Sequence, residues 1–351
     1  MTYLPPLPSC FPSAVRATAA GRRRNPLSRL AFAARTCALL AAGALPWAAH
    51  AQPAWPNAPI RMVVPFAPGA ANDAVGRIIA APLSSALGTP IVVDNRPGAG
   101  GNLGAEIAAR APADGFTLFL ANVSHATSAS MYDKLGYDLL RDFAAVTNLG
   151  ASPALLVVHP SLPVKNAKQL VALAKARPGA INYASAGAGS PTFIGGELFR
   201  FITGANMLHV PYRGGGEAIN AMVSGETSVY FAPLASALPH VKSGRLRPIA
   251  AMSERRISLL PEVPTIAEAG FPGAESGFWH GSMVPSGTPV EVINALHAAT
   301  TSALKRDDIA RRLTDVGYSV IGDPPGPFLE FVKSEVQKWR KVVQATGLTA
   351  E

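Results

Sequence analysis

The chain has 351 residues, of which 48% are hydrophobic and 15% charged, and its formal net charge is +9. Six of the 31 Lys and Arg residues, but none of the 22 Asp and Glu residues, precede Gln52, which leaves 25 basic against 22 acidic residues, or +3, in the rest. Both cysteines, Cys10 and Cys37, also precede Gln52. After that point the chain lacks the basic excess typical of nucleic-acid-binding proteins, and it can form neither a disulfide nor a thiolate metal site.

The first 51 residues have the layout of a secretory signal peptide. Four arginines between positions 22 and 29 form a basic region, an apolar stretch follows at 36–47, and Ala49-His50-Ala51 forms a small-x-small cleavage site. The apolar stretch is shorter than the roughly 20 residues that span a bilayer. We therefore expect residues 1–51 to be removed on export, which leaves about 300 residues, a length that usually divides into two domains.

From residue 54 onward, short apolar runs alternate with amphipathic stretches, a pattern typical of an α/β fold with largely parallel strands. The pattern predicts strands at 60–66, 90–94, 116–120 and 155–158, with helices that start near residues 72 and 103. Pro82 lies within the first helical pattern and predicts a kink or an early end there. Asn72 or Asp73 is expected to cap the same helix.

A second set of strand and helix units follows. A helix is expected between Asn166 and Pro178, strands at 181–184, 207–210, 228–231 and 278–284, and helices around 194–202 and 218–223. Three helices without new strands complete the chain, the last with an apolar stripe over 328–343. This order predicts two domains, 54–152 with 287–351 and 153–286, which are joined by two crossover strands that act as hinges of a cleft.

Three glycine-rich or polar loops, at 68–73, 96–102 and 185–192, each follow a predicted strand and precede a predicted helix. In open α/β sheets ligands bind at this position, beyond the C-terminal ends of the strands. The free N–H groups and the dipole of a helix start favour anions. Two such loops from opposite domains would therefore grip a small carboxylate or an amino acid. The alternative is that they are ordinary connectors, since Gly and Ser are common in such turns.

No pattern in the sequence predicts a catalytic centre, a cofactor site or a metal site. The glycines at 98–104 follow the second strand and lack the third glycine of a dinucleotide motif in register. The six histidines after Gln52 lack metal-ligand spacing, and no G-x-S-x-G motif is present. Ser124 and His125 are adjacent, so on a strand they would point to opposite faces, and His125 is expected in a loop or at the surface. Phe278 and Trp279 are expected to pack within a hinge strand.

Several longer motifs of the chain resemble one family, the extracytoplasmic solute receptors of tripartite tricarboxylate transport systems, or Bug-type receptors. The matching segments are Pro65-Phe66-Ala67-Pro68-Gly69 with Asp73, then residues 94–105, 114–118, 159–164, 182–187, 209–214 and 260–270, and Lys338-Trp339. They extend over essentially the whole chain after the signal peptide. The chain departs from the usual family pattern at Ala70, Asn72, Phe193 and Arg213, where the family usually has glycine, a small hydroxyl residue, histidine and lysine.

The resemblance implies a type II periplasmic-binding fold, in which two α/β domains close on a ligand. It also implies that a ligand carboxylate is held in the cleft largely by backbone groups and bridging waters. The ligand neighbours carried over by position are Phe66, Gly69, Ala70, Asp73, Asn122, Ser124, Ser185, Gly189, Ser190, Thr192 and Pro211. Ala70 adds a methyl group beside the expected carboxylate, and Asn72 adds a hydrogen-bond donor.

The function that the resemblance implies is that of a monomeric periplasmic receptor. Such a receptor captures a small organic acid or amino acid by domain closure and delivers it to integral-membrane transporter subunits. The alternative is a periplasmic sensor that presents the same kind of ligand to a signalling kinase, and the sequence does not separate the two because both need the same cleft. An enzyme is not expected.

Overall fold

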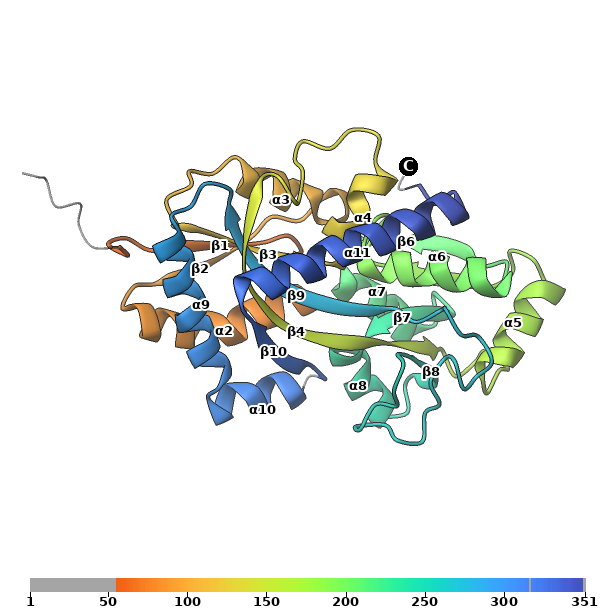
Figure 1. Ribbon diagram of the computed structural model, residues 1–351. Coiled ribbons are helices and arrows are strands. Elements are labelled where there is room, and N and C mark those ends of the chain that lie inside the picture. The colour runs from red at the N-terminus through yellow and green to blue at the C-terminus, as the bar shows by residue number, and fades with distance from the viewer. Residues whose placement is uncertain (1–54, 316, 350–351) are drawn as a thin grey trace, which may run out of the picture. The chain divides into compact units, whose positions relative to one another are not determined.

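The computed structural model describes residues 55–315 and 317–349, and the predicted signal peptide at 1–51 lies outside them. The chain from Ala54 onward contains two α/β lobes, each built on a group of parallel strands (Figure 1). Among the described residues, no helix is both long enough and apolar enough to cross a membrane.

The first lobe is built on three parallel strands, each of which leads into a helix. The strands are β1 (Ile60–Val64), β2 (Ile91–Asn95) and β3 (Thr117–Asn122), and the helices that follow are α2 (Ala71–Leu87), the short η1 (Ala99–Gly101) with α3 (Asn102–Ala109), and α4 (Val123–Met131). Helix α2 continues through Pro82 and does not end there, because Ile79 and Leu83 on either side are buried in one apolar cluster with β1.

The second lobe repeats this plan. Its parallel strands are β5 (Asn182–Ser185), β6 (Leu208–Pro211) and β7 (Val229–Pro233), and its helices are α5 (Ala167–Ala176), α6 (Pro191–Thr203), α7 (Gly215–Ser224) and α8 (Leu234–Lys242). A further strand, β8 (Arg247–Met252), pairs antiparallel with β4 (Phe143–Val158). The sequence pattern did not predict β8, whose first residues Arg247 and Pro248 interrupt its apolar run.

Two long strands join the lobes. In β4, residues 143–153 pair with β9 (Gly277–Pro285), whereas residues 154–158 pair with β7 and β8 of the second lobe. Strand β9 also pairs with β3, so the continuous strand order is β2-β1-β3-β9-β4-β7-β5-β6. As expected, Phe278 and Trp279 are buried within a crossover strand. The crossover strands agree with the predicted two-domain fold, whereas the domain limits at 152, 153, 286 and 287 remain a prediction.

The C-terminal part contains α9 (Val290–Leu304), α10 (Asp307–Asp315), β10 (Ser319–Asp323) and α11 (Pro325–Thr346). The prediction that no new strand follows residue 286 is wrong, because β10 pairs antiparallel with β4. This strand has the sequence SVIGD, and none of its side chains is fully buried, so the sequence carries little apolar periodicity there.

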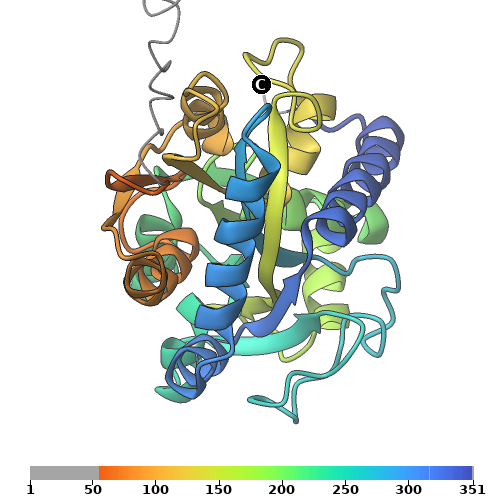
Figure 2. The ribbon, with the colours of Figure 1, turned by 60° about the vertical axis from the view of Figure 1, so that its left-hand side comes forward.

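Helix α11 packs against both lobes (Figure 1). Its apolar stripe joins a buried cluster that contains residues of α4 and β9 together with Phe193, Ile194 and Leu198 of α6 in the second lobe. Figure 2 shows α9 and α11 on either side of β4, and both helices contact that strand. Residues 325–346 are therefore not confined to the first lobe, although they belong to the C-terminal segment assigned to it from the sequence.

Candidate functional site

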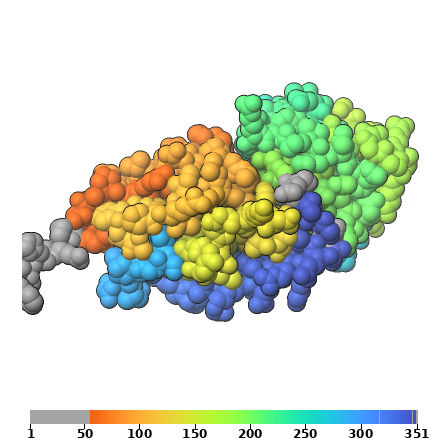
Figure 3. All heavy atoms as spheres, turned by 90° about the horizontal axis from the view of Figure 1, so that it is seen from above, coloured from red at the N-terminus to blue at the C-terminus, as the bar shows by residue number. Residues whose placement is uncertain are grey.

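The parallel strands of the two lobes end in loops that face one another. In the first lobe these loops follow β1, β2 and β3, and in the second they follow β5 and β6. A Cβ atom at Gly214, before α7, would lie 3.6 Å from the Cβ of Ala67, after β1, and Gly100 lies against the Ala188–Gly189 peptide. The space-filling view shows the first lobe, orange to yellow, and the green second lobe in direct contact (Figure 3). All eleven predicted ligand neighbours lie at the ends of these strands, on the loops or at the helix starts that follow them.

Asp73 organises the loop between β1 and α2. One of its carboxylate oxygens accepts the N–H of Gly69 at 2.9 Å and Nε of Arg77 at 3.0 Å, and the other accepts Nδ2 of Asn95 at 2.9 Å. Burial opposes ionisation, but the hydrogen bonds from Arg77, Gly69 and Asn95 hold the pKa of Asp73 below its usual value. The carboxylate is thus charged and fully engaged, and it shapes the loop.

The N-cap of α2 is Ala70, and neither Asn72 nor Asp73 occupies that position. Asp73 stands three residues into the helix and binds the Gly69 N–H from there. Asn72, at the second helical position, is 6% exposed, and its Nδ2 has no hydrogen-bond partner among the described residues.

Asn122, Ser124 and His125 form a capped helix start after β3. The Oδ1 of Asn122 accepts the N–H of Ser124 at 2.9 Å and its hydroxyl at 2.6 Å, while Nδ1 of His125 accepts the N–H of Asn122 at 3.0 Å. This is the reciprocal arrangement of a capping box. The Nδ2 of Asn122 remains without a hydrogen-bond partner within the described part of the chain.

His125 is 1% exposed on α4, so its predicted place in a loop or at the surface is wrong. Burial lowers the pKa of His125 to about 4, which keeps the ring neutral. Since Nδ1 accepts the Asn122 N–H, the other ring nitrogen carries the hydrogen and donates to the carbonyl oxygen of Gly101 at 3.3 Å. His125 therefore connects two site loops. The spacing Asn-x-x-His, in the register of a capping box, is the sequence signal that could have located it.

The hydroxyl groups of the loop between β5 and α6 bond within their own lobe. Ser190 caps α6 by accepting the N–H of Phe193 at 3.3 Å, and Thr192 accepts the N–H of Ala186 at 2.9 Å. Ser185 accepts the N–H of Gly187 at 3.0 Å and bonds Nε2 of His209 at 2.6 Å. These three hydroxyls fix the loop, and together they hold the N–H groups of Ala186, Gly187 and Phe193.

The positive electrostatic potential of the site comes from the N-termini of helices and from amide N–H groups. The helices α2, α4, α6 and α7 all begin at these loops, and each helix start favours an anion. The arginines adjoining the first two loops are paired, Arg77 with Asp73 and Arg96 with Asp94, each at 3.0 Å. A buried donor without a partner is costly, so the amides of Asn72 and Asn122 favour an acceptor such as a carboxylate. In the described ranges, no cluster of His, Cys, Asp and Glu residues could hold a metal ion.

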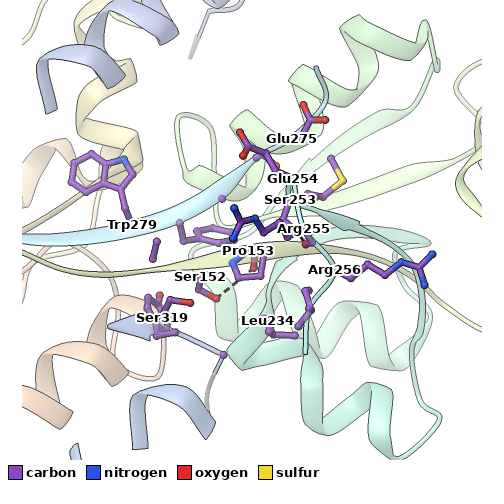
Figure 4. Close-up of a pocket in the computed structure, with 18 of the residues that line it drawn as sticks. Ser152, Pro153, Leu234, Ser253, Glu254, Arg255, Arg256, Glu275, Trp279 and Ser319 are labelled. Atoms are coloured by element: carbon purple, nitrogen blue, oxygen red, sulfur yellow. Dashed lines mark hydrogen bonds between the residues drawn. The ribbon is translucent and has the colours of Figure 1, made fainter. Parts of the chain in front are cut away.

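A separate groove of about 770 Å³ lies beside the crossover strands (Figure 4). It is bordered by Ser152, Pro153, Trp279, Ser319 and the loop from Ser253 to Arg256. None of the predicted ligand neighbours borders it. Arg256 turns away and pairs with Glu268 at 2.8 Å. The groove therefore does not coincide with the ligand site that the sequence predicts.

The chain is similar to proteins of one receptor family. Residues 75–348 match the family described as the tripartite tricarboxylate transporter family receptor. BugT of Bordetella pertussis is 35% identical over 295 residues, which cover 84% of this chain and 90% of BugT. A solved structure of an R. palustris protein with adipate is 34% identical at a TM-score of 0.80, covering 84% of this chain and 99% of that one. MatC from Rhodopseudomonas palustris, with bound malate, is 32% identical at a TM-score of 0.80, covering 82% of this chain and all of MatC.

Proposed function

The chain belongs to the family of tripartite tricarboxylate transporter receptors, and from this premise we propose that it captures a small dicarboxylate between its lobes. The observation that carries the proposal is the set of helix starts on the facing loops, with three buried amide donors, at Asn72, Asn102 and Asn122, that have no hydrogen-bond partner among the described residues. Each helix start contributes about 0.3–1 kcal/mol to anion binding when exposed, and up to about 2 kcal/mol when partly buried. Several together are needed for micromolar affinity, about −8 kcal/mol.

The facing loops suit a ligand with an anionic group at each end. The first lobe would present to the ligand the strand ends and helix starts near Phe66, Gly69, Ala70, Asp73, Asn122 and Ser124, and the second lobe those near Ser185, Gly189, Ser190, Thr192 and Pro211. Relatives with adipate and with malate support this ligand class. Asp73 and Ser185 would act by holding their loops, since their side-chain oxygens are already bonded. Phe193, which is buried against His209 and the cluster around α11, would act within the second lobe.

We further propose where the protein acts in the cell and to which partner it delivers its ligand. The protein would be exported by cleavage after residue 51, act as a monomer in the periplasm, and deliver its ligand in the closed form to integral-membrane transporter subunits. Its domains would be 54–152 with 287–351 and 153–286, with α11 packed across both. The relatives are binding receptors, which favours a receptor over an enzyme and transport over presentation to a kinase.

Thermal unfolding of the ligand-stripped protein tests this function. Adipate, malate and other dicarboxylates are compared with monocarboxylates, tricarboxylates, amino acids and aromatic acids. A ligand present at 100 times its Kd stabilises the native state by about 2.7 kcal/mol, so a selective rise of Tm with dicarboxylates is expected. A rise with another class alone, or with none, would overturn the dicarboxylate assignment.

A further inference from the structure

Two glycine loops from different lobes are in direct backbone contact. Gly100 lies in η1 of the first lobe, and Gly189 lies just before α6 of the second. A Cβ atom at Gly100 would lie 2.9 Å from the carbonyl carbon of Gly189 and 3.0 Å from the carbonyl oxygen of Ala188. The neighbours of Gly100 are therefore backbone atoms, which cannot rotate away as a side chain can.

Tyr132 covers the same place from the first lobe. It ends α4, it is half-buried, and a Cβ atom at Gly189 would lie 2.5 Å from its hydroxyl oxygen and 3.2 Å from its ring. Gly189 is thus enclosed between Gly100 and Tyr132. Its φ of 74° and the φ of 65° at Gly100 are both in the left-handed region, which glycine adopts without strain.

These contacts join residues of different lobes, and the two lobes are connected by the hinge strands β4 and β9. A contact of this kind is made when the lobes meet and is lost when they part. A ligand is retained only as long as the closed form is favoured, because the apparent affinity scales with the fraction of the competent state.

We propose that Gly100, Gly189 and Tyr132 form the closure contact of this receptor and thereby set the rate of ligand release, with Gly100 and Tyr132 acting without contact to the ligand. The proposal rests on the proposed function. The three residues are positioning residues: the two glycines allow the backbones to meet, and Tyr132 limits how far Gly189 can move. A side chain at either glycine would hold the cleft partly open.

The structure offers a matched control. Gly88, at the C-terminus of α2, has φ 66° and ψ 17°, nearly the values of 65° and 15° at Gly100, and apart from its two chain neighbours no described residue lies within 4 Å of a Cβ atom there. Gly88→Ala therefore introduces the same backbone strain without a collision. The difference between Gly100→Ala and Gly88→Ala isolates the contact between the lobes.

The test uses adipate and malate as probes with the full-length protein exported to the periplasm. Because both native cysteines precede Gln52, Arg110→Cys on α3 and Asn220→Cys on α7, both exposed, would carry dyes that report lobe separation after export and cleavage. For Gly100→Ala and Gly189→Ala we expect release rates raised at least about tenfold over Gly88→Ala, with greater lobe separation and a Tm equal to that of the control. Tyr132→Phe should partly reverse the effect of Gly189→Ala, and should not reverse that of Gly100→Ala.

Failure of the proposed function and failure of the closure contact give different results. If the parent protein binds neither probe, the proposed function fails, and the closure contact fails with it. If the parent protein binds but Gly100→Ala and Gly189→Ala release ligand at the rate of Gly88→Ala, the closure contact alone is wrong. A lower Tm in the two variants, with an unchanged release rate, would show that the lobes are packed together permanently. This result would also overturn the proposal.

Discussion

Trp279 on strand β9 donates its indole N–H to Glu335 on helix α11, at 3.0 Å. The same carboxylate oxygen accepts the indole N–H of Trp339, one turn further along α11, at 3.2 Å. Both indole rings are almost completely buried. Glu335 therefore ties the C-terminal helix to a crossover strand, at the place where that helix passes from the first lobe to the second.

Glu335→Ala is expected to leave two buried indole N–H groups without acceptors. An unsatisfied buried donor costs about 1–3 kcal/mol, so the free energy of unfolding should fall by about 2–4 kcal/mol. Urea denaturation followed by tryptophan fluorescence measures this change. Glu330→Ala, an exposed position on the same helix, serves as the control, and equal effects of the two changes would contradict the assignment.

Asp73→Ala is expected to release the loop between β1 and α2. Hydrogen bonds to charged groups contribute about 1.5–3 kcal/mol, and this carboxylate accepts them from Gly69, Arg77 and Asn95. We expect the free energy of unfolding to fall by about 2–3 kcal/mol and dicarboxylate affinity to weaken. Asp308→Ala removes an exposed pair with Arg306 and should change neither quantity measurably. A variant at Asp73 that kept full affinity would show that this loop does not contact the ligand.

Gly69→Trp is expected to fill the cleft and weaken dicarboxylate binding by more than about 100-fold, or about 2.7 kcal/mol. Gly69 is exposed, and apart from its two chain neighbours no described residue lies within 4 Å of a Cβ atom there, so the indole has room without displacing the core. Gly88→Trp is the matched control, because it also has a positive φ and open space. Isothermal titration measures the loss of affinity, and the Tm shows whether the variant is also destabilised. Equal affinities in the two variants would remove Gly69 from the site.

Stability is expected to fall between pH 7 and pH 4.5. Burial lowers the pKa of His125 to about 4 and that of His280 to about 3, whereas an unfolded histidine titrates near 6.5. The unfolded state therefore binds more protons within this window, and the free energy of unfolding decreases as the pH falls, by up to about 1.4 kcal/mol per pH unit for each histidine. The pKa of Asp73 is lowered, so protonation of this carboxylate reduces the free energy of unfolding only below about pH 4.

Urea unfolding at pH 7, 6 and 5 measures this dependence. His125→Gln removes one of the buried titrating groups and should reduce the slope. Equal slopes in the parent protein and in His125→Gln would show that His125 does not contribute.

Local sequence determined the order of strands, loops and helices. Apolar runs predicted β1, β2, β3, β5 and β7 close to their observed positions, and the glycine-rich or polar loops after β1, β2 and β5 were predicted as the site. These features follow from the period of the side chains and from turn chemistry, which involve residues close together in the chain. The resemblance to the receptor family rested on the same contiguous segments.

Only the tertiary structure decided the rest. Strand β4 pairs in both lobes, β10 returns to β4 across more than 150 residues, His125 lies buried beneath Gly101, and Gly100 meets Gly189. Each of these depends on partners that are distant in the sequence, and a strand or loop carries no local mark of the partner it will meet. The contact between Gly100 and Gly189 in particular joins loops of different lobes, and side-chain periodicity does not encode that contact.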